Sequence, residues 1–157
     1  MADPILKVTN LETYYGPILA IRGVSFEVQA GNIVTILGSN GAGKTTVLKT
    51  VSGVMDPQKG SVLFEGREIQ RTDPDKVMRL GISHVPEGRE VFPFLSVREN
   101  LVATAANRRG GANPWTLKRV LELFPRLAER AGNMGNQLSG GKIPGIELLF
   151  KISIDHS

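Results

Sequence analysis

A glycine-rich segment at residues 38–45 constrains this chain more than any other feature of its sequence. The segment reads Gly-Ser-Asn-Gly-Ala-Gly-Lys-Thr, which fits the pattern G-x-x-x-x-G-K-[ST] of a phosphate-binding loop. It follows a largely β-branched run at residues 33–37, typical of a parallel strand covered on both faces, and it opens a helical pattern. A strand, a glycine loop and a helix in direct succession predict an α/β fold with an anion site where the helix begins.

Each residue type in this loop has a chemical reason. Glycines let the backbone wrap closely around phosphate oxygens, and the Lys44 ammonium reaches the β and γ phosphates as a flexible point charge. The Thr45 hydroxyl is offered to Mg²⁺. A glycine turn that merely joined a strand to a helix would require neither side chain, so we favour a nucleotide site. The expected nucleotide-binding residues in this segment are Gly38, Ser39, Asn40, Gly41, Ala42, Gly43, Lys44, Thr45 and Thr46.

Hydrophobic periodicity predicts the elements around the loop. Alternating apolar residues indicate short strands of a half-exposed antiparallel sheet. The expected strands are residues 5–15, 24–29 and 61–65, with a second core strand at residues 82–85. The expected helices run from the loop to Gly53, with Val47, Leu48, Val51 and Val54 as apolar residues; from Asp73-Pro74 to Gly81; from a capping box at residues 96–99 to about Ala106; and from Asn113-Pro114 to Pro125.

Composition narrows the class of protein. The chain has 157 residues, of which 41% are hydrophobic and 22% charged, which indicates one globular domain. It has no Cys and two isolated His residues, which excludes structural disulfides, thiolate metal sites and a zinc cluster. The sequence shows neither a signal peptide nor an apolar run that could span a membrane, so we expect a soluble, cytosolic protein. Its net charge of +4 comes from scattered basic residues, which favours ordinary solvated faces over a nucleic-acid patch.

A second constellation, Leu-Ser-Gly-Gly at residues 138–141, lies far downstream of the loop. Together with the loop it makes the chain resemble the ATP-binding subunits of ABC transporters. The resemblance implies that the bound nucleotide is ATP with Mg²⁺. It also implies that Ser139 and Gly141 contact the γ-phosphate of ATP held by an opposite subunit. A second ATP-binding subunit, identical or different, is therefore an expected partner.

Two further segments resemble parts of the same family. Residues 13–16, Thr-Tyr-Tyr-Gly, look like its aromatic loop, which implies that the Tyr15 ring stacks on adenine. An ordinary strand-edge tyrosine is the alternative, and Tyr14 is the nearby substitute. The segment that begins at His84 resembles the one where most ABC ATPases carry a glutamine that touches Mg²⁺. Glu87 stands at that position and is a candidate metal or water contact, against the alternative of a solvated loop carboxylate, whereas we expect His84 to be a hydrogen-bonded strand histidine.

Three short segments resemble one subfamily. Pro-Glu-Gly-Arg at residues 86–89, Leu-Ser-Val-Arg-Glu-Asn-Leu at 95–101 and Glu-Leu-Phe-Pro-Arg-Leu at 122–127 are similar to one of the two ATP-binding subunits of branched-chain amino-acid importers. This likeness implies a subunit that couples ATP binding and hydrolysis to transport. It also implies integral membrane permease subunits as partners and a cytoplasmic, peripheral position on the inner face of the cell membrane. No nucleic-acid partner is expected.

The resemblance stops after the Leu-Ser-Gly-Gly segment. The family continues with an apolar strand that ends in Asp-Glu and with a switch histidine. In this chain Glu147 and Asp155 are not adjacent and His156 is the penultimate residue, so we identify no Walker B acid. We therefore expect the 157-residue chain itself to hydrolyse ATP negligibly.

These observations together predict an α/β P-loop NTPase fold of the ABC ATPase type. It would combine an antiparallel β subdomain with an inserted helical subdomain, and the C-terminal half of its core would be missing. Residues 1–141 would form the partial ATP-binding domain, with the helical subdomain at about 93–141 and an unmatched tail at 142–157. Two alternative functions stay open: a non-hydrolysing nucleotide-binding remnant, and a soluble ABC-type ATPase associated with nucleic acid.

Overall fold

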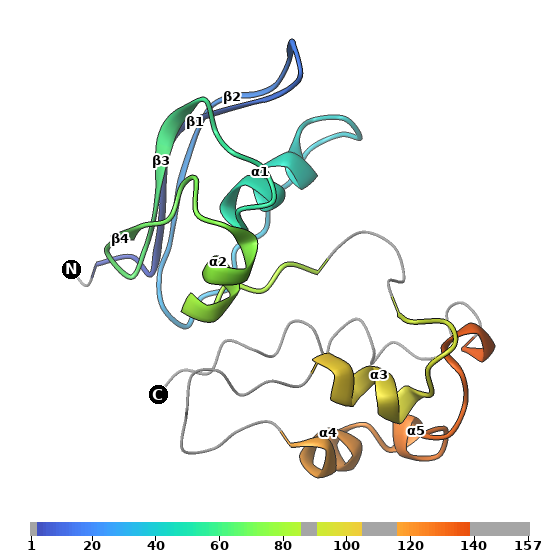
Figure 1. Ribbon diagram of the computed structural model, residues 1–157. Helices are drawn as coiled ribbons and strands as arrows, with labels where there is room; N and C mark the ends of the chain where they lie inside the picture. Colours follow the sequence, from blue (N-terminus) through green and yellow to red (C-terminus); the bar gives the residue numbers. More distant parts are fainter. Residues whose placement is uncertain (1–2, 86–90, 105–115, 139–157) are drawn as a thin grey trace. The chain divides into compact units, whose positions relative to one another are not determined.

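The computed structural model describes residues 3–85, 91–104 and 116–138. They belong to two compact units, one that ends at His84 and one that begins at Val85, and each is described by itself. The first contains β1 (Leu6–Tyr15), β2 (Ile18–Val28), α1 (Lys44–Val51), β3 (Lys59–Phe64), β4 (Arg67–Glu68) and α2 (Pro74–Leu80) (Figure 1). The second contains α3 (Val97–Thr104), α4 (Leu117–Leu123), α5 (Pro125–Ala128) and the 3-10 helix η1 (Gly135–Gln137). None of the helices in these ranges is long and apolar enough to cross a membrane.

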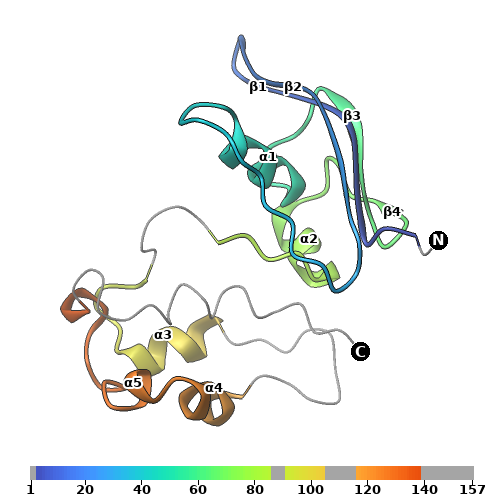
Figure 2. The ribbon, with the colours of Figure 1, turned by 180° about the vertical axis from the view of Figure 1, so that it is seen from behind.

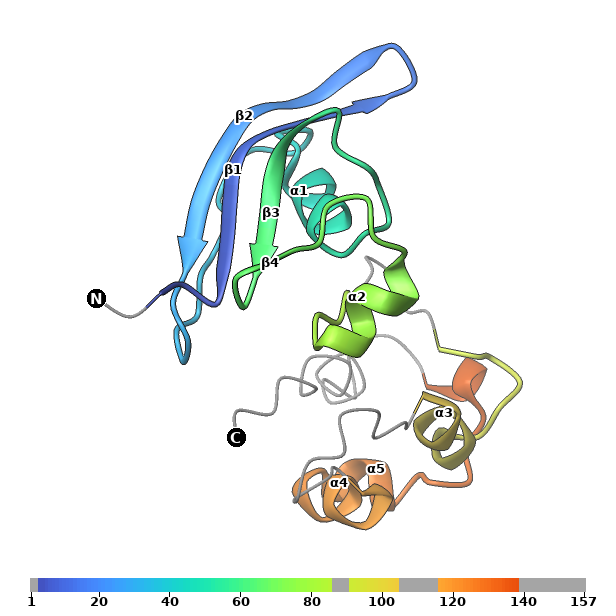
Figure 3. The same cartoon turned by 60° about the vertical axis from the view of Figure 1, so that its left-hand side comes forward.

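The four strands of the first unit form one antiparallel sheet in the order β2-β1-β3-β4. A tight turn after Tyr15 joins β1 to β2, so that Tyr15 pairs with Ile18. β2 therefore begins earlier than the predicted residues 24–29, because the turn brings the two strands into register at once. Its later half confirms the predicted alternation of half-buried and exposed side chains. Figure 3 shows this long hairpin beside β3.

The core of the first unit consists of sheet residues that pack against α1 and α2. Its buried members are Val8, Leu11, Ile21, Val47, Val51, Val62, Phe64, Ile69 and Val77. The helix predicted after the loop is confirmed as α1. Leu48, predicted on its apolar face, is instead 50% exposed, because the helix buries only the stripe that faces the sheet. Val54, also predicted there, lies beyond the end of the helix at Val51 and is 51% exposed.

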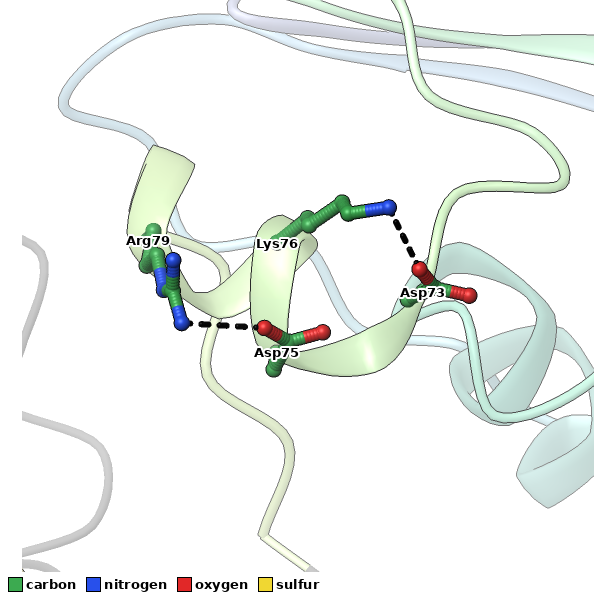
Figure 4. A network of polar contacts seen from close by, with 4 residues as sticks. All are labelled: Asp73, Asp75, Lys76 and Arg79. Carbon is green, nitrogen blue, oxygen red and sulfur yellow. Dashed lines mark hydrogen bonds and ion pairs between the residues drawn. The ribbon is translucent and has the colours of Figure 1, made fainter.

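Helix α2 confirms the predicted start and stop. Asp73 is its N-cap and Gly81 is its C-cap. The Asp73 carboxylate accepts no capping hydrogen bond from a backbone N–H of the helix, and it accepts instead from Lys76 Nζ at 2.6 Å. Arg79 also pairs with Asp75 at 3.1 Å, and both ion pairs are exposed (Figure 4). Exposed pairs of this kind contribute little to stability, so the helix depends mainly on its packing against the core.

The core strand predicted at residues 33–37 is wrong for this structure. The segment forms no strand and runs as a plain trace between β2 and α1 (Figure 2). Ile33 and Leu37 are 96% and 85% exposed. A parallel core strand requires neighbouring strands that pair with its backbone, and no segment among the described residues does so. The strand predicted at residues 82–85 is likewise not formed, although Ile82 packs against the core.

In the described residues of the second unit, the regular elements are helices, joined by loops and by one isolated β-bridge between Ser96 and Met134. At the start of α3 the Ser96 hydroxyl accepts from Glu99 N at 3.2 Å, and the Glu99 carboxylate accepts from Ser96 N at 2.8 Å, which confirms the predicted capping box. The side chain of Thr116 caps α4 by accepting from Arg119 N. The predicted start of this helix at residues 113–114 lies outside the described residues. The buried apolar residues here are Val97, Val120 and Leu127.

Candidate functional site

The glycine-rich loop at residues 38–45 leads directly into helix α1. Gly41 and Gly43 have φ of +85° and +87°, a backbone conformation that glycine adopts at little cost. Gly43 is the N-cap of α1 and brings no capping side chain, and the first turn of α1 holds no acidic residue. The positive end of the helix dipole therefore faces the loop, and no carboxylate in that turn competes with a phosphate.

Lys44 is held at the loop by the backbone of the loop itself. Its Nζ atom donates to Gly38 O at 2.9 Å and to Ser39 O at 2.7 Å. An ammonium group has three N–H donors, so these two bonds fix the direction of the side chain. Two of the three donors bond to acceptors among the described residues, and the third can donate to a phosphate oxygen. The charge is thus oriented before a ligand arrives.

The loop is anchored to the hairpin of β1 and β2. A Cβ atom on Gly43 would overlap the Ile21 side chain and would lie 3.1 Å from Ala20 O, so only glycine fits at this contact. A Cβ atom on Gly41 would meet nothing within 4 Å. Gly43 is therefore needed for the close approach of loop and hairpin, whereas Gly41 is needed for its backbone angle alone.

Tyr15 is the last residue of β1 and is 45% exposed. The strand register pairs Thr13 with Ile21, the residue that contacts Gly43. Tyr15 lies two residues farther along the strand, which is about 7 Å at the usual rise of a strand. A nucleotide whose phosphates bind the loop can span this distance between Thr13 and Tyr15, so its base can reach the Tyr15 ring. Tyr14 is half-buried on the opposite face of the strand, so Tyr15 is the better candidate for base stacking, and this role stays a prediction.

Three predicted site residues fall outside the described part of the chain. They are Glu87, Ser139 and Gly141. Their contacts with metal, water or a partner's nucleotide therefore stay predictions. Thr46, predicted to bind nucleotide, is 5% exposed, so the core encloses its side chain and its backbone is the part that can face a ligand.

The described residues suit a magnesium ion that arrives with its nucleotide. No group of three or more His, Cys, Asp or Glu side chains within them could hold a metal by itself. Thr45, in the first turn of α1, supplies the kind of hard oxygen donor that Mg²⁺ prefers. Mg²⁺ is commonly bound by one or two protein oxygens together with the phosphates of its substrate. A single hydroxyl at the loop therefore suits a Mg²⁺ ion whose other ligands are phosphate oxygens and water.

Sequence reasoning missed the buried hydroxyl groups of Thr13 and Thr50, which join β1 to α1. Thr13, Thr46 and Thr50 are 0%, 5% and 2% exposed. Thr13 Oγ1 lies 3.1 Å from Thr50 Oγ1, and Thr50 Oγ1 donates to Thr46 O at 2.8 Å. The signal that could have found them is the presence of threonine at strand and helix positions that the apolar periodicity assigns to the core.

Comparison with known proteins places these features in a wider group. A family model described as ABC transporter matches residues 21–150. A high-affinity branched-chain amino acid transport ATP-binding protein of Pseudomonas aeruginosa is 42% identical over 138 residues, which cover 88% of this chain and 59% of the relative. A phosphate import ATP-binding protein of Tropheryma whipplei is 30% identical over 150 residues, which cover 88% of this chain and 58% of the relative. The chain thus spans less than two thirds of the length of both.

One solved structure has a similar fold. It is a dimeric ATP-binding cassette in a post-hydrolysis state with ADP and phosphate bound. It superposes with a TM-score of 0.74 at 25% identity and covers 94% of this chain and 69% of that one.

Proposed function

The chain belongs to the ABC transporter family of ATP-hydrolysing proteins, and from that premise we propose that it binds ATP at residues 38–45 as part of an importer subunit. The predicted P-loop NTPase fold of the ABC type is confirmed by the same similarities. Within that family, the function of this chain is argued from its own loop.

The observation that carries the proposal is the placement of positive charge at the loop. The Lys44 ammonium donates to the Gly38 and Ser39 carbonyls, and helix α1 begins at Lys44 itself. Two positive groups therefore meet within one short turn, which suits a polyphosphate better than a single carboxylate. The glycines at positions 41 and 43 let the backbone of this turn approach the phosphate oxygens.

The remaining contacts of the nucleotide follow from the same site. Tyr15 would stack on the base, and Thr45 would contribute an oxygen to Mg²⁺, which supplies charge neutralisation at the phosphates. Glu87 would lie near the metal or water. Ser139 and Gly141 would contact the nucleotide of a second subunit.

We extend the proposal to substrate and partners. Branched-chain amino acids are the proposed cargo, because the relative named for their transport is 42% identical and the subfamily segments at residues 86–89, 95–101 and 122–127 point the same way. The proposed partners are a second ATP-binding subunit and membrane permease subunits. This assembly would place the chain on the inner face of the cell membrane.

Substitution of one lysine tests the nucleotide site. Lys44→Ala should weaken binding of Mg-ATP about 10- to 150-fold, the scale of a charge-assisted hydrogen bond of about 1.5–3 kcal/mol. Isothermal calorimetry on the full chain measures this change. Lys49→Ala is the matched control, because Lys49 lies in the last turn of the same helix, away from the loop. Unchanged ATP affinity in Lys44→Ala would show that the phosphates bind elsewhere.

A further inference from the structure

A series of buried hydrogen bonds joins the strand that carries Tyr15 to the helix that follows the loop. Thr13 lies in β1 two residues before Tyr15, and its Oγ1 atom is 3.1 Å from Oγ1 of Thr50 in α1. Thr50 Oγ1 also donates to Thr46 O at 2.8 Å in the first turn of α1. All three threonines are at most 5% exposed, so water does not compete for these bonds.

The direction of these bonds follows from counting hydroxyl protons. Thr50 has one hydroxyl proton, which goes to the Thr46 carbonyl because a carbonyl oxygen can only accept. The Thr13 hydroxyl must therefore donate to Thr50 Oγ1. A buried hydroxyl that lost its partner would be penalised, so the bond favours one relative position of β1 and α1.

A second set of contacts ties the same stretch of β1 to the segment after α1. Gln58 N donates to Glu12 O at 2.8 Å, and Gln58 Oε1 accepts from Tyr14 N at 3.1 Å. Glu12 also pairs with Lys59 at 3.1 Å. The residues on either side of Thr13 are thus held as well, by the segment that follows α1 and by the first residue of β3.

The elements joined in this way carry the two ends of the nucleotide site. Tyr15 at the end of β1 is the candidate for base stacking, and the phosphate-binding loop runs into α1. The covalent structure of ATP limits the distance between its base and its phosphates. Stacking and phosphate binding can therefore occur together only when β1 and α1 keep a suitable separation.

We propose that the Thr13–Thr50 hydroxyl pair is a positioning element that fixes the separation between Tyr15 and the phosphate-binding loop. It thereby selects ligands that carry a base together with a triphosphate over ligands that carry phosphates alone. Both threonines are buried in the core and act through Tyr15 and α1, so they are positioning residues. This inference rests on the proposed nucleotide site.

The test compares Mg-ATP with inorganic triphosphate in the presence of Mg²⁺, by calorimetry on the full chain. Thr13→Val keeps the shape of the side chain and removes its hydroxyl, while Thr50 keeps its bond to the Thr46 carbonyl. We expect ATP affinity to fall about fivefold, the scale of one net hydrogen bond, and triphosphate affinity to stay unchanged. Thr13→Ser, which keeps the hydroxyl, should restore ATP affinity.

Two controls separate positioning from a general loss of stability. Val62→Ala removes volume from the same core, where Val62 is 0% exposed, and leaves the hydroxyl pair intact. It should not change the ratio of the ATP and triphosphate affinities. In a Tyr15→Ala background, Thr13→Val should cause no further loss of ATP affinity, because no stacked ring is left to position.

The outcomes distinguish this inference from the proposed function. Equal weakening of ATP and triphosphate by Thr13→Val, or weakening of neither, would overturn the positioning role and leave the nucleotide site standing. Thr50→Val removes the acceptor of the pair and must show the same selective loss, so parental ATP affinity in that variant overturns the role even if Thr13→Val does not fold. If the parent chain binds neither ATP nor triphosphate, both proposals are overturned.

Discussion

The contact between Gly43 and the hairpin can be tested by adding one methyl group. In Gly43→Ala the new Cβ atom would overlap the Ile21 side chain and would lie 3.1 Å from Ala20 O, at a φ of +87°. The left-handed conformation costs an alanine about 1–2 kcal/mol. Overpacking of a well-filled site costs about 1–3 kcal/mol more. We therefore expect Gly43→Ala to lower the free energy of unfolding by about 2–5 kcal/mol, a large share of a typical domain's stability.

Gly41→Ala is the matched control for this substitution. Its φ of +85° is nearly the same, but its Cβ atom would meet nothing within 4 Å. It should therefore lose only the conformational part, about 1–2 kcal/mol. The difference between the two variants, about 1–3 kcal/mol, isolates the contact of the loop with the hairpin.

Urea unfolding followed by far-UV circular dichroism measures both losses from the midpoints and slopes. Equal losses in the two variants would refute the close approach of Gly43 to Ile21. The same result would remove the argument that places Tyr15 within reach of a nucleotide in the loop, because that argument starts from this contact. The stability measurement therefore bears on the site even before any ligand is added.

Two further predictions concern one side chain in each unit. Tyr15→Phe keeps the ring and should bind ATP as well as the parent, whereas Tyr15→Ala should lose about 1–3 kcal/mol of binding free energy, as measured by a fluorescence titration. Equal ATP affinities of the parent and both variants would indicate that the base stacks on Tyr14 instead. In the capping box, hydrogen bonds from the Ser96 hydroxyl and backbone hold the pKa of Glu99 below its ordinary value of 4.5. The ionised Glu99 carboxylate therefore stabilises the folded state at pH values above 4.5, and this stabilisation is lost as the pH falls through the lowered pKa. Glu99→Gln should accordingly make the melting temperature less sensitive to acid. The same dependence of melting temperature on pH in the parent and the variant would contradict this.

Features that depend on neighbours in the sequence could be predicted without a structure. The capping box at residues 96–99, the helix that follows the glycine loop and the stop of α2 at Gly81 each depend on side chains within a few positions. Their hydrogen bonds and backbone angles are set locally, so periodicity and capping preferences were sufficient. The antiparallel strands could be predicted for a similar reason, because the alternation of apolar and polar residues along a strand indicates which face of the sheet is buried.

Residues 33–37 show where local reasoning stops. A β-branched run states a preference for extended backbone, but a strand forms only where another strand supplies hydrogen-bond partners. No described segment does so here, and Ile33 and Leu37 are left 96% and 85% exposed. The apolar run at residues 33–37 thus needs neighbouring residues that bury its side chains, and the described residues do not supply them.

The candidate site combines local and long-range features. The pattern of residues 38–45 locates the loop from the sequence alone, but Thr13 and Thr50 lie 37 positions apart, and Gly43 meets Ile21 across two different elements. No local pattern marks these contacts, because they depend on the register of β1 with β2 and on the packing of α1 against the sheet. In the proposed site the local loop supplies affinity for phosphates, which any polyphosphate can use. In the same proposal, preference for a ligand that also carries a base comes from the long-range contacts, since among the described residues these contacts relate Tyr15 to the loop.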